Sequence, residues 1–245
     1  MIAGDVNTVN NNQPEFIARP MMMKTTAVMA DEAAPSFSEK SFSDFHLYTL
    51  SDPVTLNDNS QKQIEFIPKV YNINVRKYNQ LSISAGGYSQ TNLKASNKIE
   101  FQNNKKNGLG IPLPKGTVRV FKTDDSDGSL EFIGEDSINH TPKDENITLN
   151  TGNAFDITAN KYATTYNSYD KGGYSAEMNM TITNHKDISA EIVVEYAAYY
   201  GDNLKLNWKT PNLNVEKVSA SLYRIKKIVK PDEKFVFAWT EDYRP

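Results

Sequence analysis

The residues that most often perform catalysis or hold a metal are few in this chain of 245 residues. It contains no cysteine, which excludes disulfides, thiolate metal ligands and a cysteine nucleophile. Its three histidines are His46, His140 and His185, and none has the i,i+2 or i,i+4 partner that is typical of zinc sites. We therefore predict no metal site built on these histidines.

The stretch TDDSDG at residues 123–128 is the most calcium-like segment. An EF-hand loop needs an acidic residue at its first position and a glutamate at its twelfth. With Gly128 at the sixth position, those two positions hold Thr123 and Gly134. The same letters suit a β-hairpin turn between residues 118–122 and 130–133, in which Asp127-Gly128 supplies the residue with positive φ. We favour the turn, and the sequence leaves open whether residues 124–127 bind calcium.

The acidic residues form no clear catalytic pair. Glycoside hydrolysis needs two carboxyl groups about 5–10 Å apart across a cleft. Glu131, Glu135 and Asp136 lie close in the sequence, but neighbouring strand residues point to opposite faces, so solvated surface charge is the favoured interpretation. The chain also lacks the G-x-S-x-G elbow and the phosphate-binding G-x-x-x-x-G-K-[ST] loop. We predict no catalytic residues, no cofactor and no enzymatic activity.

The elements that position these residues are predicted to be β-strands. From residue 41 onwards apolar and polar residues alternate with a period of two, as they do in half-buried strands. The clearest alternations cover residues 176–183 and 188–196, and the four-residue turn between them predicts a hairpin. No window of twelve or more residues carries a helical apolar stripe, which disfavours a parallel α/β fold. Many short strands are typical of antiparallel sandwiches and barrels.

We predict an all-β protein with two packed antiparallel β domains behind an extended N-terminal arm. Residues 1–40 show neither strand nor helix periodicity, so we expect an arm or linker there. A boundary near Gly152 divides the remainder into a β domain at 41–152 and an immunoglobulin-like β-sandwich at 153–245. The alternative is a long strand beginning near Phe155 that bridges both halves.

Several motifs occur in a fixed order along the chain. They include GIPLPKGTVRVF at 110–121, LEFIGED at 130–136, INHTP at 138–142 and LNTGNAFDI at 149–157. This series resembles the C-terminal domain, of unknown function, of the mucoidy-inhibitor-like family, and the resemblance covers nearly all of residues 41–245. It implies a β-rich, non-catalytic protein without an established substrate. Fuller members carry a preceding β region and a coiled coil, so the resemblance implies the back half of a larger architecture.

Tyrosine and methionine provide the candidate interface. Four tyrosines gather around residues 162–174 with a spacing that fits no strand period, so we expect an exposed loop there. Tyrosine offers rigid contact area with a polar end and is enriched at interfaces, although packing within strands is the alternative explanation. Three consecutive methionines lie in the predicted arm. The candidate interface residues are Tyr162, Tyr166, Tyr169, Tyr174, Met21, Met22 and Met23.

These features together predict a non-enzymatic structural or assembly protein. The formal net charge of −3 argues against a nucleic-acid binder, which usually carries a concentrated basic excess. We find no apolar run long enough for a membrane span and no secretory signal. The expected partners are other protein subunits, in a virion or surface layer, and a virion or cell envelope is favoured over the cytoplasm. The alternatives are an envelope protein of the mucoidy-inhibitor type and a carbohydrate-binding or hydrolytic β-sandwich.

Overall fold

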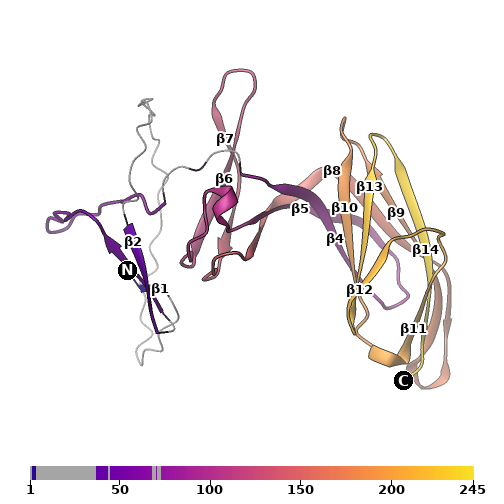
Figure 1. Cartoon of the computed structure of the whole chain (residues 1–245). Helices are drawn as coiled ribbons and strands as arrows, with labels where there is room; N and C mark the ends of the chain where they lie inside the picture. The colour runs from indigo at the N-terminus through magenta and orange to yellow at the C-terminus, as the bar shows by residue number, and fades with distance from the viewer. Residues whose placement is uncertain (1, 4–36, 44, 68–69, 71–72) are drawn as a thin grey trace. The chain divides into compact units, whose positions relative to one another are not determined.

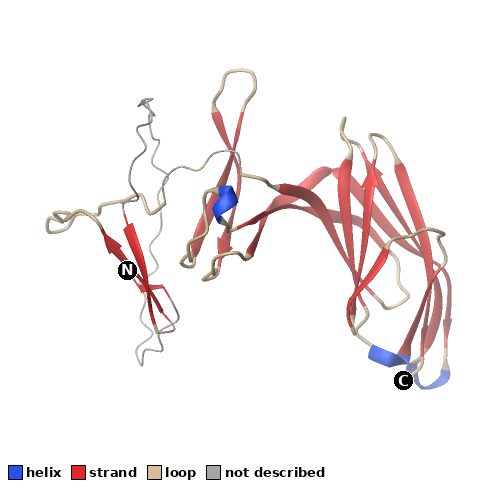
Figure 2. Ribbon diagram, viewed as in Figure 1, coloured by secondary structure: helices blue, strands red, loops and turns tan. Residues whose placement is uncertain are grey.

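The computed structural model describes residues 2–3, 37–43, 45–67, 70 and 73–245. The all-β prediction is confirmed, since the described residues form strands joined by loops and three short 3-10 turns (Figure 2). The chain divides into two units, each built from several segments. Unit 1 contains residues 1–74, 102–116 and 138–146, and unit 2 contains residues 75–101, 117–137 and 147–245.

Unit 1 contains a three-stranded antiparallel sheet in the order β1-β3-β2. Its strands are β1 (Ile2–Ala3), β2 (Phe37–Phe42) and β3 (Phe45–Leu50). Residues 37–40, predicted as part of the arm, therefore belong to a strand. Residues 4–36, including Met21, Met22 and Met23, lie outside the described residues, and so does most of the predicted arm.

A buried asparagine organises the other segments of unit 1. Asn103 is fully buried, and its side-chain amide donates to the carbonyl oxygens of Ile111 and Pro142. Its Oδ1 accepts from the Gly110 amide at 3.0 Å. The short turn η1 (Lys105–Asn107) lies within the same segment and is capped by the side chain of Asn104. Side-chain amides thus satisfy buried backbone groups that regular secondary structure would otherwise satisfy.

Unit 2 is built on a mixed nine-stranded sheet in the order β11-β14-β9-β8-β5-β4-β10-β13-β12 (Figure 1). Strands β4 and β10 run parallel, whereas the pairs β10–β13, β11–β14, β12–β13, β9–β14, β4–β5 and β8–β9 are antiparallel. Strands β6 (Gly116–Thr123) and β7 (Leu130–Ile138) form a separate two-stranded sheet. The strands of the large sheet are β4 (Arg76–Ser84), β5 (Gln90–Gln102), β8 (Asn146–Ser168), β9 (Tyr174–Asn184), β10 (Ala190–Ala197), β11 (Leu204–Trp208), β12 (Val215–Ser219), β13 (Leu222–Val229) and β14 (Lys234–Tyr243).

The large sheet curls so that its two ends face each other across one core. Tyr196 on β10 and Trp239 on β14 are separated by four intervening strands, yet their ring centroids are 5.7 Å apart. Trp208 on the edge strand β11 also contacts Tyr196, at 5.6 Å. All buried side chains of this cluster, including Met180 and Ile192, therefore share one apolar interior.

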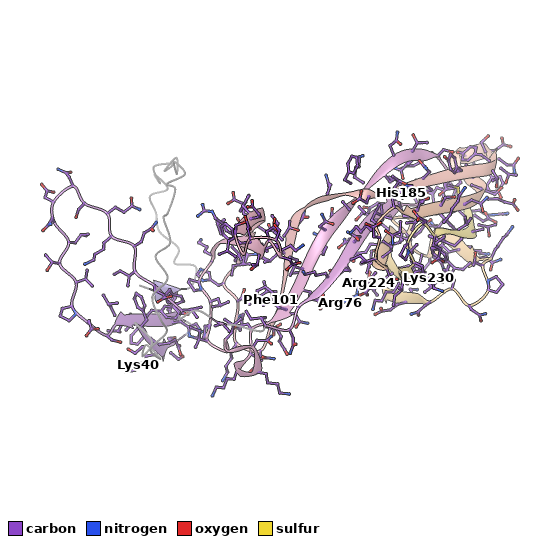
Figure 3. The ribbon with its side chains drawn as sticks, turned by 90° about the horizontal axis from the view of Figure 1, so that it is seen from above. Lys40, Arg76, Phe101, His185, Arg224 and Lys230 are labelled. Atoms are coloured by element: carbon purple, nitrogen blue, oxygen red, sulfur yellow. The ribbon has the colours of Figure 1, made fainter. Side chains whose placement is uncertain are left out.

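The outer face of unit 2 carries paired charges across neighbouring strands. On β4, Arg76 donates to Glu191 on β10, and Arg224 on β13 donates to Glu195 on the same strand β10 (Figure 3). Gln80 on β4 also donates to Glu195, at 2.8 Å. Because these groups are partly exposed, each pair adds little stability but favours one register over its neighbours.

The hairpin predicted from residues 176–183 and 188–196 is wrong. Strand β9 pairs with β8 and β14, whereas β10 pairs with β4 and β13. Alternate residues of both strands, such as Met180 and Ile192, are buried in the same core, so the strands meet face to face rather than edge to edge. The connection between them therefore crosses from one side of the core to the other.

The domain boundary predicted at 152/153 falls within strand β8. This strand runs without a break from Asn146 to Ser168, so a long strand does bridge the expected boundary. Strands β4 and β5, expected in the first domain, lie between β8 and β10 in the large sheet. Without them, the strands of residues 153–245 would form two separate groups of four and three strands. The β4–β5 pair joins these groups into one sheet.

The side chain of Asn184 stabilises the connection between β9 and β10, so its replacement is expected to destabilise the fold. This side chain is fully buried and donates to the carbonyl oxygens of Ile188, Val229 and Lys230, while its Oδ1 accepts from the Lys186 amide. We expect Asn184→Ala to lower the free energy of unfolding by about 2–3 kcal/mol, because it leaves buried carbonyls unsatisfied. Urea unfolding measures the change. The exposed neighbour His185→Ala serves as the control and should stay within about 0.5 kcal/mol of the parent.

Candidate interaction surface

One end of unit 2 gathers four loops and the C-terminus. Strand register places them together: Tyr174 pairs with both Ser168 and Tyr243, and Ala197 pairs with both Ser84 and Leu222. The end surface, as we name it here, consists of residues 85–89, 166–173, 198–203, 219–221 and 243–245. Figure 1 shows the short turns after β8 and β10 at the same end of the sheet as the C-terminus.

The end surface has the composition of a recognition surface. Its loops contain the sequences AGGYS, YNSYDKGG and AYYGDN. Tyrosine, serine, glycine and asparagine are the residues that antibody loops favour, because tyrosine gives rigid contact area and the small residues give adaptable hydrogen bonding. Loops that cluster at one end of a β-sandwich are also where such proteins place their binding residues.

The predicted interface tyrosines divide between exposed and buried positions. Tyr162 and Tyr166 are 42% and 53% exposed, whereas Tyr174 is only 4% exposed. The expected loop at 162–174 is largely strand, since β8 continues to Ser168 and pairs with β9, with an irregularity between Ala163 and Thr165. The irregularity shifts the following side chains to the other face, and Tyr169 and Tyr174 lie beyond the end of β8, so the four tyrosines share no period of two.

Aromatic contacts connect the tyrosines of several segments. Tyr166 stacks on Tyr174 with ring centroids 5.6 Å apart, and Tyr200 stacks on Tyr243 at 4.1 Å. Tyr174 also contacts Tyr200 and Tyr243. Tyr169 lies beneath the Arg244 guanidinium, 5.0 Å from the ring centroid. The structure therefore brings Tyr200 and Tyr243 to the same end of the sheet as the predicted interface residues Tyr166 and Tyr174.

A buried carboxylate contacts Tyr174, the ring that links this group. Glu241 is 1% exposed, and its two oxygens accept five hydrogen bonds of 2.8–3.0 Å. The donors come from four strands or loops and are the amides of Gly86 and Gly87, the hydroxyls of Tyr174 and Tyr196, and the indole of Trp239. The carboxylate therefore fixes the 85–89 loop to both sides of the core.

A buried lysine holds the same loop from a second direction. Lys161 on β8 is fully buried, and its Nζ donates to the Ser84 carbonyl at 2.8 Å. The same Nζ lies 4.3 Å from the centre of the Tyr88 ring, in cation–π geometry. Loss of hydration lowers the pKa of Lys161, while the Glu241 charge acts in the opposite direction. Buried groups of this kind preorganise a surface because they restrict the loops that display it.

Burial also shifts the pKa values of the two tyrosines whose hydroxyls donate to Glu241. Loss of hydration raises the pKa of Tyr196 well above its ordinary value of 10.0, and the Glu241 charge raises it further. The pKa of Tyr174 is raised by the same burial and by its hydrogen bond to Glu241. Both hydroxyls therefore stay protonated and act as donors throughout the neutral range.

Sequence reasoning missed Glu241 and Lys161, although the strand pattern contains a signal for both. Glu241 continues the inward-facing series of Phe237 and Trp239, and Lys161 follows Ile157 and Ala159 in the same way. A charged residue in register with buried apolar residues must find partners inside the core. Extending the alternation of buried positions by two residues along each strand would therefore have identified Glu241 and Lys161 as buried polar groups.

The three histidines each have a different local partner. His46 contacts Glu39 at 2.7 Å, and His185 contacts the Thr158 hydroxyl at 3.2 Å. The Nδ1 of His140 faces the Lys115 amide at 3.3 Å. Among the described residues, no group of three or more metal-binding side chains is placed to hold an ion.

The calcium-like stretch forms the predicted hairpin turn between β6 and β7. Gly128 has φ +75°, the conformation expected for the second residue of Asp-Gly. The side chain of Asp124 accepts from the Ser126 amide and hydroxyl, and Asp127 accepts from the Ser129 amide. These bonds lower the pKa of both carboxyl groups.

The candidate carboxylates of β7 have separate partners. Glu135 pairs with Arg119 at 3.1 Å, and Glu131 accepts from the Ser129 hydroxyl. Asp136 accepts from the amide of Asn150 at 2.7 Å. These contacts fit the interpretation of surface charge and turn stabilisation.

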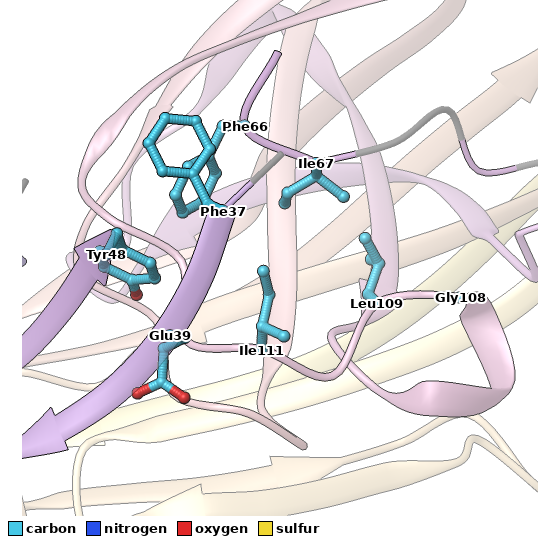
Figure 4. A pocket seen from close by; sticks show the side chains of 8 residues that line it. All are labelled: Phe37, Glu39, Tyr48, Phe66, Ile67, Gly108, Leu109 and Ile111. Carbon is cyan, nitrogen blue, oxygen red and sulfur yellow. The ribbon is translucent and has the colours of Figure 1, made fainter. Parts of the chain in front are cut away.

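Unit 1 contains a small cavity of about 230 Å³ (Figure 4). Its wall is mostly apolar, and the Phe66 ring contacts both Phe37 and Tyr48, at 5.4 and 4.8 Å. Glu39 is the charged residue of the lining. Burial, with a contribution from Glu39, raises the pKa of Tyr48 to about 12. Ligand pockets usually exceed about 300 Å³, so we assign this cavity to the packing of unit 1.

No protein-family model, curated protein or solved structure matches the chain. The resemblance to the mucoidy-inhibitor-like family therefore stays a prediction. The described part of the chain contains no helix with the length and hydrophobicity needed to cross a bilayer.

Proposed function

We propose that this protein is a non-enzymatic structural or assembly protein that binds other protein chains through the end surface of unit 2. The observation that carries the proposal is the combination of exposed tyrosines above a fully hydrogen-bonded buried carboxylate. Tyr199 and Tyr166 are 76% and 53% exposed, and Glu241 fixes the adjacent 85–89 loop. Rigid aromatic side chains on restrained loops are well suited to protein recognition.

We further propose an immunoglobulin-like architecture for residues 153–245 and a virion or cell-envelope setting for the protein. The seven strands of residues 153–245 support an immunoglobulin-like description, with β4 and β5 added between its two groups of strands. We propose a virion, surface layer or cell envelope as the setting, where an N-terminal arm before β2 would extend its contacts. The mucoidy-inhibitor-like resemblance is compatible with an envelope setting.

Site-specific photo-crosslinking tests the proposal. We expect a photoreactive phenylalanine at position 199, introduced in the producing cell, to give discrete protein adducts on denaturing gels. The matched control places the same residue at position 188, which is 70% exposed and follows β9 at the opposite end of its strand. Equal adducts at both positions, or none at position 199, would contradict the proposal. An adduct that carries glycan instead of protein would favour the carbohydrate-binding alternative.

A further inference from the structure

The hairpin of β6 and β7 exposes three apolar side chains on one face. Phe121 and Phe132 are in edge contact, with ring centroids 5.6 Å apart, and they are 50% and 55% exposed. Leu130 is 65% exposed and lies two residues before Phe132, so it shares that face. Soluble proteins seldom leave contiguous apolar side chains of this kind uncovered unless another molecule binds there.

The sheet of the hairpin has two strands, although Asp136 on β7 also accepts from the Asn150 amide on β8. Among the described residues, β6 and β7 hydrogen-bond only to each other as a sheet. Two-stranded hairpins are marginally stable in water by themselves, and packing of one face is the usual remedy. A second apolar face placed on Phe121, Leu130 and Phe132 would provide that packing.

Opposite charges accompany the apolar face. Arg119 lies two residues before Phe121 on the same side of β6, and its Nε donates to Glu135 at 3.1 Å. Both side chains are more than half exposed. A two-fold axis through the apolar face would bring Arg119 of one copy toward Glu135 of the other. The surface is therefore complementary to itself.

The exposed area is compatible with a weak dimer. The three apolar side chains together expose about 300 Å², given that an aromatic side chain can bury about 150–250 Å². Two copies would then bury about 600 Å² from these residues alone, and the flanking charged side chains would bring the total toward the roughly 1,000 Å² of small specific interfaces. This size favours a reversible dimer over an obligate one.

We infer that the face of Phe121, Leu130 and Phe132 is a self-association site that packs against the same face of a second copy about a two-fold axis. This inference rests on the proposed assembly function but uses a surface other than the end surface. The bound partner is a second copy of this chain because the face combines an apolar centre with one positive and one negative charge.

Sedimentation velocity of the full chain over a wide concentration range tests the inference. We expect a reversible monomer–dimer equilibrium, and we expect the double variant L130S/F132S to weaken it at least about tenfold. The matched control is Phe155→Ser, which removes an aromatic side chain that is 90% exposed on β8. A monomeric parent at every concentration, or an equal loss with Phe155→Ser, would overturn the inference.

Charge exchange provides a test that does not depend on apolar packing. R119E and E135R should each weaken the dimer, and the double variant should restore it, because both two-fold contacts are then rebuilt with reversed signs. Failure of the double variant to recover would overturn the two-fold arrangement. If the parent protein is monomeric but still gives adducts at position 199, only the self-association site is disproved. If the parent protein dimerises but gives no adducts at position 199, only the proposed end-surface function is disproved.

Discussion

Glu241→Ala is expected to lower the free energy of unfolding of unit 2 by about 3–5 kcal/mol. The substitution leaves five buried donors without their acceptor and leaves the fully buried Lys161 without the nearby negative charge. Each unsatisfied buried donor costs about 1–3 kcal/mol, although water that enters the space recovers part of that cost. Urea or guanidinium unfolding, followed by tryptophan fluorescence, measures the change because Trp239 contacts the same carboxylate.

Two further substitutions make this prediction specific. Glu241→Gln keeps the shape and one acceptor oxygen, so we expect a smaller loss than for alanine. The matched control is Glu177→Ala, which removes an acidic residue that pairs with Lys209 at the surface and should cost at most about 1 kcal/mol. A loss for Glu241→Ala as small as that of the control would show that the carboxylate does not organise the core.

The second large effect is a loss of stability at alkaline pH. The pKa values of Tyr174 and Tyr196 are raised in the folded protein above the ordinary value of 10.0. Above about pH 10, the unfolded chain releases these protons and the folded chain keeps them, so the unfolded state binds fewer protons and stability falls as pH rises. Each tyrosine contributes a slope of about 1.4 kcal/mol per pH unit in that range. The two together should remove about 2–3 kcal/mol between about pH 10 and 11.

Lys161 and Tyr48 also change the dependence of stability on pH. The lowered pKa of Lys161 acts oppositely, because the unfolded chain binds the extra proton up to the ordinary lysine pKa of 10.5. Above that pH the lysine no longer contributes. In unit 1, Tyr48 acts in the same direction as the other tyrosines, between its ordinary value of 10.0 and its raised pKa of about 12.

Denaturant unfolding at a series of pH values, combined with the absorbance of ionised tyrosine, measures this dependence. The double variant Y174F/Y196F should be less stable at neutral pH and should lose most of the alkaline slope. Tyr199→Phe, at an exposed position of the end surface, should leave the slope unchanged. A parent protein whose stability is flat between about pH 9 and 11 would contradict the assignment of the two buried hydroxyls.

Much of the secondary structure could be predicted because strand formation leaves a local signal. The period of two over residues 176–183 predicted β9, and Asp127-Gly128 predicted the β6–β7 turn that the structure confirms. The irregularity near Ala163 hid the end of β8, because an extra residue in a strand shifts the side chains that follow to the other face. That local break is why residues 162–168 resembled a loop.

The candidate surface was only partly predictable. The tyrosines were recognised by their type, but their grouping with Tyr200, Tyr243 and the 85–89 loop depends on the register of strands far apart in the sequence. Glu241 was visible only as an acidic residue near the C-terminus. Its role depends on donors contributed by residues up to 155 positions away.

The sequence by itself determined that this chain is all-β and in which segments apolar and polar residues alternate. It also established that cysteine chemistry is excluded and that tyrosine is the best-supplied interface residue. Only the tertiary structure decided which strands pair, since alternation says that a face is buried and not what it is buried against. That is why β9 and β10 meet across the core, why β4 lies parallel to β10, and why Glu241 and Lys161 share the loop beneath the exposed tyrosines.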